Sequence, residues 1–218
     1  MKLFYPFSRI FSPLLQSWAF GDGGIIIIFI LLIIQLPAQD NRLRLQQADL
    51  LENKNINGKS TQFLTGNVVF KKGQMTIRCD NARYIERTGQ GLLIGHVVMD
   101  KEGQKLTADS VHFDSPNDKF TCYNNVHIWD EDYDLTADTV IYYSELDSGI
   151  ANGNSKMIQE SQIITAHHLR YVKHERKNAV SYTAEQDVTI VESARVATCG
   201  LAIYDVENDK TWLRINPK

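Results

Sequence analysis

The sequence predicts an all-β protein, an elongated open β-jelly roll built from stacked antiparallel hairpin repeats with a 29-residue period. Three observations predict it. One phrase recurs at a fixed interval, apolar and polar side chains alternate, and turn residues follow roughly every 8 to 12 positions. No segment after residue 39 carries the 3.6-residue apolar stripe typical of an amphipathic helix.

The recurring phrase is LTADSVHFD at 106–114, which returns as LTADTVIYY at 135–143. Related copies begin at Ile77 and Ile164 in the same step, and a fifth begins at Ala197 after a somewhat longer step. An upstream motif repeats with them, as Gly66-Asn-Val-Val-Phe70, Gly95-His-Val-Val-Met99, Asn124-Asn-Val-His-Ile128 and Gly153-Asn-Ser-Lys-Met157. Such self-similarity indicates stacked units, because one unit alone cannot bury its apolar face.

Each unit predicts three half-buried strand segments. Apolar residues alternate with polar ones at Val97 and Met99, and β-branched and aromatic side chains are frequent. The step between Ala108 and Val111 is three instead of two, which predicts a corner or bulge at Asp109-Ser110 in every copy. Tight turns between the segments favour antiparallel hairpins folded into two facing sheets over a parallel β-helix.

The N-terminal segment 1–39 is predicted to lie outside this domain, which spans 40–218. An apolar run, IIIIFILLIIQL at 25–36, has the length of a signal-peptide core and is shorter than the roughly 20 residues of a transmembrane helix. Cleavage near Ala38 would release a soluble exported protein. An uncleaved membrane anchor is the alternative.

Charge and cysteine content exclude several classes of protein. The part after residue 39 has 21 basic and 25 acidic residues, a net charge of −4, so a nucleic-acid partner is not expected. Three cysteines, Cys79, Cys122 and Cys199, are too few for a disulfide framework, and their spacing fits no metal site. Cys79 and Cys199 occupy the repeat position that is Ala elsewhere, so they are expected to be small core residues.

No catalytic site, metal site or cofactor is predicted. Asp80, Asp109 and Asp138 occupy one repeated place, and a catalytic carboxylate is not expected in every unit. We expect each to bond backbone N–H groups at the corner. The six histidines show no ligand spacing, and no nucleophile or phosphate-loop motif is present.

The predicted interior is the remaining candidate site, as a closed core or as an apolar groove. Its lining residues are Val68, Phe70, Ile77, Tyr84, Val97, Met99, Leu106, Val111, Phe113, Val126, Ile128, Leu135, Val140, Tyr142, Met157, Ile164, Leu169 and Tyr171. A basic cluster includes Arg170, Lys173, Arg176 and Lys177 and is either a solvated loop or a contact for an anionic headgroup.

The GNVVF motif followed by a turn and TAD-x-V-x-[FY], repeated after an apolar leader, resembles the OstA-like family. That family includes the LptA and LptC proteins and the periplasmic domain of LptD. The resemblance, over Leu43 to Tyr204, implies an open β-jelly roll with an apolar groove for the acyl chains of lipid A. It also implies a non-enzymatic role in lipopolysaccharide transport to the outer membrane.

The resemblance further implies that the end strands join other β-jelly rolls, or copies of this chain, through their edges. We expect these edges near Arg42 to Leu51 and Thr211 to Ile215. Three departures from the motif, Ser155-Lys156, His167 and the longer last step, affect the continuity of the groove near its C-terminal end.

Two alternatives stay open at this point. One is a secreted parallel β-helix protein that acts on or binds polysaccharide. The other is an LptC-like member of the same export machine, held in the inner membrane by its N-terminal segment.

Overall fold

The computed structural model describes residues 43–174 and 179–218, and in them it is all-β with one short 3-10 helix, η1 (Ser115–Asn117). The strands are β1 (Arg44–Gln47), β2 (Leu50–Ile56), β3 (Lys59–Lys72), β4 (Met75–Ile85), β5 (Gln90–Lys101), β6 (Gln104–Asp114), β7 (Lys119–Trp129), β8 (Asp134–Tyr143), β9 (Ser148–Gln159), β10 (Gln162–His174), β11 (Ala179–Glu192), β12 (Arg195–Asp205) and β13 (Lys210–Arg214). The predicted boundary near residue 39 and the apolar run before it lie outside the described residues.

The strands form one sheet in which chain neighbours pair, and every pairing among the described residues is antiparallel. Only the N-terminal edge departs from chain order, because β1 and β2 both pair with β3. The all-β prediction is therefore confirmed. The parallel β-helix alternative is wrong for the described part, since it requires parallel neighbours.

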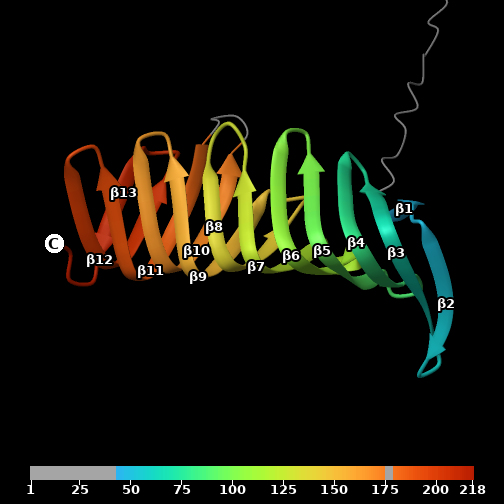
Figure 1. Ribbon diagram of the computed structural model, residues 1–218. Coiled ribbons are helices and arrows are strands. Elements are labelled where there is room, and N and C mark those ends of the chain that lie inside the picture. The colour runs from blue at the N-terminus through green and yellow to red at the C-terminus, as the bar shows by residue number, and fades with distance from the viewer. Residues whose placement is uncertain (1–42, 175–178) are drawn as a thin grey trace, which may run out of the picture. The chain divides into compact units, whose positions relative to one another are not determined.

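This sheet is folded over on itself into two layers, which Figure 1 shows as a front and a back row of strand arms joined along the lower edge. Each strand from β3 to β12 shifts register near its middle and so divides into two arms. The two facing sheets expected from the sequence are thus one sheet whose strands β3 to β12 each run through both layers. The strands are accordingly longer than expected, with 10 to 14 residues from β3 to β12.

We name the layers by their turns. Layer A contains the arms that end at turns 73–74, 102–103, 130–133, 160–161 and 193–194. Layer B contains the arms that end at turns 86–89, 115–118, 144–147 and 206–209. The edge where the arms meet is called the bend, and the opposite edge, where the turns of both layers lie, is called the rim (Figure 1).

A β-bulge produces the bend. At each odd-numbered strand from β3 to β11, two successive residues have positive φ and stand opposite a single residue of the neighbouring strand. In β5 these residues are Gly95 (φ 79°) and His96 (φ 42°). The facing does change at Asp109, as predicted, but the extra residue is on the partner strand, in the Gly-Asn part of the motif, instead of at Asp109-Ser110.

The core lies between the layers. Burial alternates along each arm, with small residues such as Ala108 and Cys79 beside the bend and aromatic residues such as Phe113 nearer the rim. Gly91 leaves room for the Phe113 ring, because a Cβ at Gly91 would lie 2.6 Å from it. Small side chains fit where the layers converge, and large ones fill the wider part of the interior.

Candidate functional site

All eighteen predicted lining residues lie in the single apolar core between the layers. Each is buried, and Tyr84 is the most exposed at 9%. The core is one cluster that extends from β3 to β12. The sequence periodicity therefore placed the interior correctly.

The two layers are in direct contact in this structure. The Phe70 ring of layer A lies 6.0 Å from the Tyr84 ring and 6.3 Å from the Phe113 ring of layer B, measured between centroids. Tyr133, in a layer A turn, lies 5.6 Å from Tyr171 of layer B. The interior is thus filled at these positions by the protein's own side chains.

Polar side chains connect the layers along the rim. We call this set the seam, and it consists of Lys72, Lys101, Gln104, Asp118, Asp130, Asp132, Tyr142, Ser144, Asp147, Gln162, Lys173 and Tyr182. At its N-terminal end, the ammonium group of Lys72, at the end of β3 in layer A, donates to Asp118 in a layer B turn. Ser144, in the next layer B turn, also donates to Asp118. The Lys72 side chain is only 3% exposed, and its ammonium group also lies 3.7 Å from Glu145, so two carboxylates compensate this buried charge.

The second contact of the seam repeats the first, one unit further along the chain. Lys101, at the end of β5, donates to Asp147 at 2.9 Å and to the Ser144 carbonyl oxygen at 2.6 Å. Both charged side chains are largely buried, with 25% and 17% exposure. The Tyr142 hydroxyl of layer B lies 3.0 Å from the same carboxylate, and its single hydrogen is shared between this carboxylate and Gln104.

The third contact has the charges exchanged between the layers. Lys173, at the end of β10 in layer B, donates to Asp130 at 2.7 Å and contacts Asp132 at 3.0 Å, both in a layer A turn. Burial raises the pKa of Asp130, but the hydrogen bonds from Lys173 and from the backbone outweigh it, so the pKa is below its usual value. Burial lowers the pKa of Lys173, but its two carboxylate partners outweigh it and raise the pKa. Both pKa shifts favour the charged forms of Asp130 and Lys173.

Uncharged contacts complete the seam. The Tyr142 hydroxyl lies 2.6 Å from Gln104 Oε1, and the Tyr182 hydroxyl lies 2.9 Å from Gln162 Oε1, each pair joining layer B to layer A. Burial raises the pKa of both phenols, so they are neutral donors at physiological pH. The seam therefore combines charged and neutral contacts along the rim.

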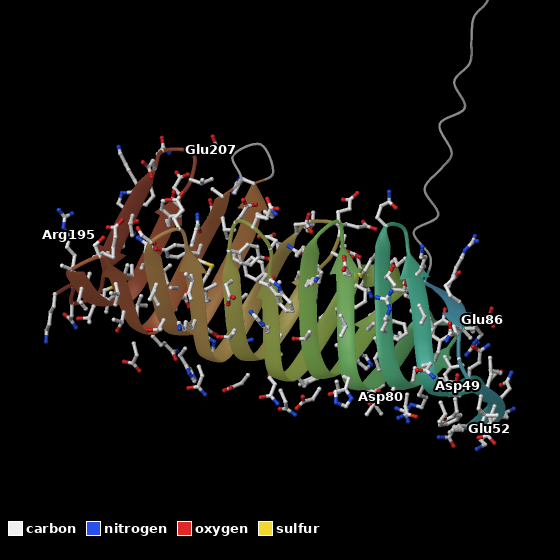
Figure 2. The ribbon with its side chains drawn as sticks, turned by 45° about the horizontal axis from the view of Figure 1, so that its top comes forward. Asp49, Glu52, Asp80, Glu86, Arg195 and Glu207 are labelled. Carbon is white, nitrogen blue, oxygen red and sulfur yellow. The ribbon has the colours of Figure 1, made fainter. Side chains whose placement is uncertain are left out.

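The bend has its own repeated contact, between an Asp of one strand and the side chain after the bulge Gly or Asn of the next. The described residues include four such pairs, the first with an Asp that lies between β1 and β2: Asp49 with Asn67 at 2.8 Å, Asp80 with His96 at 2.8 Å, Asp109 with Asn125 at 2.9 Å and Asp138 with Asn154 at 2.9 Å. Asp49 and Asp80 lie along the bent edge in Figure 2. The structure thus pairs these carboxylates with side chains, whereas the sequence predicted backbone partners.

The last units lack this Asp, and the structure shows what replaces it. In the fourth unit, His167 stands at the place of the Asp, and its ring lies 4.9 Å from the ring of His168, which bonds Asn152 of the preceding strand at 2.8 Å. In the fifth, Gly200 donates its N–H to the Ile215 carbonyl at 2.8 Å, and a Cβ at Gly200 would lie 2.7 Å from the Ile215 side chain. The C-terminal segment therefore occupies the place of the carboxylate.

In the fourth unit, two buried polar side chains lie beside the apolar core. Ser155, in place of a Val, is 1% exposed, and its hydroxyl has no hydrogen-bond partner among the described residues. Gln159, one repeat after Asp130, is likewise buried with an unpartnered Oε1. The expected departure at this end of the core is thus visible as buried polar atoms.

The basic cluster is only partly described, because Arg176 and Lys177 lie outside the described residues. Lys173 belongs to the seam, where two carboxylates hold it. Arg170 is exposed on the outer face of layer B and lines a hollow of about 340 Å³ beside Val172 and Trp212. The structure therefore separates Arg170 from Lys173.

No group of His, Cys, Asp or Glu side chains in the described part of the chain is placed to bind a metal ion. The three cysteines are buried, free thiols. Burial raises the pKa of the Cys79 thiol to about 11, which makes it a poor nucleophile. Between 43 and 218, outside the gap at 175–178, no helix has the length and apolar character to cross a membrane.

The sequence interpretation missed the seam. Its signal was present, because one repeat period separates Lys72 from Lys101, and the same period separates Asp118 from Asp147. Charged residues in phase with a repeat, at strand ends next to turns, indicate a shared structural role. Their pairing was not predictable, since each contact joins residues 43 to 46 positions apart.

Comparison with known proteins agrees with this architecture. The chain is similar in fold to the crystal structure of LptH, the LptA-homologous periplasmic component of the conserved lipopolysaccharide transport device from Pseudomonas aeruginosa, at 12% sequence identity and a TM-score of 0.50, over 57% of this chain and 99% of that one. None of the curated proteins compared matches the chain. A family model described as LptA/(LptD N-terminal domain) LPS transport protein matches residues 47–147. The stretch 47–147 is therefore similar to the LptA/LptD N-terminal, or OstA-like, family of lipopolysaccharide transport proteins.

Proposed function

We propose that the protein is a non-enzymatic carrier and bridge component that holds the acyl chains of lipopolysaccharide between layers A and B during transport to the outer membrane. The observation that carries this proposal is the continuous apolar core through consecutive repeats. The family match supports it, because the family is one of lipopolysaccharide transport proteins. The eighteen lining residues are the proposed contacts of the acyl chains.

The physical task of such a carrier is to keep hydrocarbon away from water. Each exposed methylene costs about 0.8 kcal/mol, so one acyl chain of about 12 to 14 carbons needs on the order of 10 kcal/mol of shielding. An apolar interior supplies this shielding without chemistry. The energy for directed movement then comes from another component, which we propose to be an ATP-driven transporter in the inner membrane.

Since the interior is filled in this structure, loading requires the layers to move apart. Phe113, Leu135 and Tyr171 are at most 2% exposed and contact other core residues. An acyl chain therefore replaces contacts between the layers with contacts to itself. Because both kinds of contact are apolar, the net cost of the exchange is small compared with leaving the chain in water.

The ends of the sheet are the proposed sites for other β-jelly rolls or for copies of this chain. β1 and β2 form one terminal edge, and β13 forms the other. The first edge continues beyond Leu51, where it was expected to end, as far as Ile56. Apolar side chains are exposed at both ends: Leu50, Leu51 and Ile56 at the first, and Val196, Trp212 and Ile215 at the second. Edge strands of this kind pair readily with added strands.

We place the protein in the periplasm, with the apolar run 25–36 as a signal peptide. The inner-membrane-anchored, LptC-like role is the second candidate, since the same run is present in the sequence. Mass spectrometry of the mature N-terminus separates the two. A chain that begins near Gln39 supports the soluble carrier, and a chain that retains the run supports the anchored one.

Photo-crosslinking tests the carrier function. A photoreactive residue at Leu106, Phe113 or Tyr142 should capture lipopolysaccharide in cells that produce it. His112, which is exposed on the outer face next to Phe113, is the matched control position. Absence of an adduct at all three interior positions, or equal capture at His112, would contradict the proposal.

A further inference from the structure

The bend and the rim are held together in different ways. At the bend, the two layers are continuous, because the same ten strands from β3 to β12 run through both. Separation of the layers at the bend would require these strands to leave the sheet. The bend is therefore a continuous backbone connection between the layers, with left-handed bulge residues where the strands change direction.

At the rim, the described residues connect the layers through side chains. The contacts are those of Lys72, Lys101, Lys173, Tyr142 and Tyr182. The backbone hydrogen bonds found between neighbouring rim segments, such as Ser115 N to Gly89 O at 3.0 Å, stay within layer B. The seam can thus open without the loss of any of these backbone bonds.

We propose that the interior opens laterally along the seam, with the bend as the hinge, and that the seam contacts form a gate which controls access to the core. The inference rests on the proposed function for the identity of the ligand, a hydrocarbon chain of a lipid. The opening itself does not depend on that identity. Lateral opening exposes the core along the whole rim, so a chain enters from the side and does not have to be threaded from one end.

The contacts of the seam suit a gate because each one is strong when closed and reversible. Lys101 loses two acceptors when the seam opens, and Asp147 loses Lys101 but gains water. A charge moved from a partly buried pair into water recovers its hydration, which offsets much of the lost attraction. A hydrogen bond to a charged group contributes enough that its removal changes an opening equilibrium by roughly tenfold or more.

A native thiol reports the opening. Cys122 lies in the core on β7 and is 0% exposed, and burial raises the pKa of its thiol. It reacts with a thiol reagent only when the interior becomes accessible. Cys79→Ala and Cys199→Ala remove the other two thiols and introduce the residue that the repeat itself has at those positions, as in Ala108 and Ala137.

In this Cys122-only background, Lys101→Met removes the charge and keeps most of the aliphatic stem. We expect Cys122 labelling with a maleimide to become roughly tenfold faster without added lipid. The acceleration should persist at low urea with a weak dependence on urea concentration, since an opening exposes less surface than global unfolding. Lys101→Arg, which keeps the charge, should restore slow labelling.

Lys54→Met is the matched control, because Lys54 forms a 2.8 Å pair with Glu52 on β2, away from the seam. Unchanged labelling in Lys101→Met, or acceleration in both variants, overturns the proposal. So does acceleration that follows urea as steeply as global unfolding. Should Lys101→Met fail to fold, Asp147→Asn, which keeps an acceptor for Tyr142, is measured with the same three criteria.

The lipid arm separates this inference from the proposed function. With purified lipopolysaccharide and a crosslinker at Phe113, faster capture in Lys101→Met supports both. Faster thiol labelling without capture leaves the gate standing and contradicts the lipid carrier. Capture at equal rates in parent and variant contradicts the gate, because loading then does not pass through the seam.

Discussion

The bend and the rim join the same two layers, but the bend does so with backbone and the rim with side chains. At the bend, left-handed residues such as Gly95 turn the strands, and exposed Asp contacts such as Asp80 with His96 decorate the outer side. At the rim, partly buried ion pairs such as Lys101 with Asp147 close the interior. Each repeat thus contains a covalent connection between the layers at the bend and a non-covalent one at the rim.

The largest effect is expected at the rim. Lys173→Met leaves Asp130 and Asp132, whose side chains are 7% and 16% exposed, without their shared cation. We expect the free energy of unfolding to fall by about 2 to 3 kcal/mol, because uncompensated buried charge is costly. Urea denaturation measures it. A loss as small as that of the exposed-pair control Lys54→Met, expected within about 0.5 kcal/mol, would contradict the importance of the seam.

The next effect is expected at the bend. Gly95→Ala introduces a Cβ 2.3 Å from Asp80 Oδ2 at a φ of +79°. We expect a loss of about 2 kcal/mol, from left-handed backbone strain together with displacement of Asp80. Gly103→Ala, at a φ of +95° with nothing within 4 Å of the added Cβ, carries the strain alone and should cost about 1 kcal/mol. Equal losses in the two variants would show that the Asp contact has no part in the bend.

A smaller effect is expected from the Asp contacts themselves. Asp109→Ala removes the acceptor of the 2.9 Å bond from Asn125, and both residues are exposed. We expect a loss of about 0.5 kcal/mol in urea denaturation, because water replaces an exposed hydrogen bond. A loss larger than that of Lys173→Met would reverse the ranking of bend and rim.

The smallest effect is a pH dependence at the bend. The hydrogen bond to Asp80, together with its negative charge, raises the pKa of His96 above 6.5. The stabilisation is therefore fully present below pH 6.5 and is lost as the pH rises through the pKa of the folded state. An NMR titration should give a higher His96 pKa in the parent than in Asp80→Asn. The same pKa in both would show that the contact does not persist in solution.

Much of the fold was predictable from the sequence because each repeat carries the same local pattern. Period-two alternation identified the buried faces, and the three-residue step from Ala108 to Val111 located the change of facing. The end strands were also found, except for the extension to Ile56. These features depend on neighbours in the chain, which the repeat displays five times.

The parts that escaped prediction depend on contacts between distant units. Whether Asp80 bonds backbone or the His96 side chain depends on the register of the next strand. Which rim residues meet depends on how the arms of the two layers cross, and this crossing places Lys72 opposite Asp118. The repeat position of Ser155 predicts that its side chain is buried. No local pattern indicates that its hydroxyl is buried without a hydrogen-bond partner.

The exchange of charges at the third rim contact fixes the angle at which the two layers cross. If the crossing changed by one repeat in one direction, Lys101 would meet Lys173, and in the other direction Asp130 would meet Asp147. Either arrangement places like charges together at a partly buried position, which is unfavourable. A simple series of identical pairs would tolerate both. The reversed pair thus disfavours a crossing of the two layers that is shifted by one repeat.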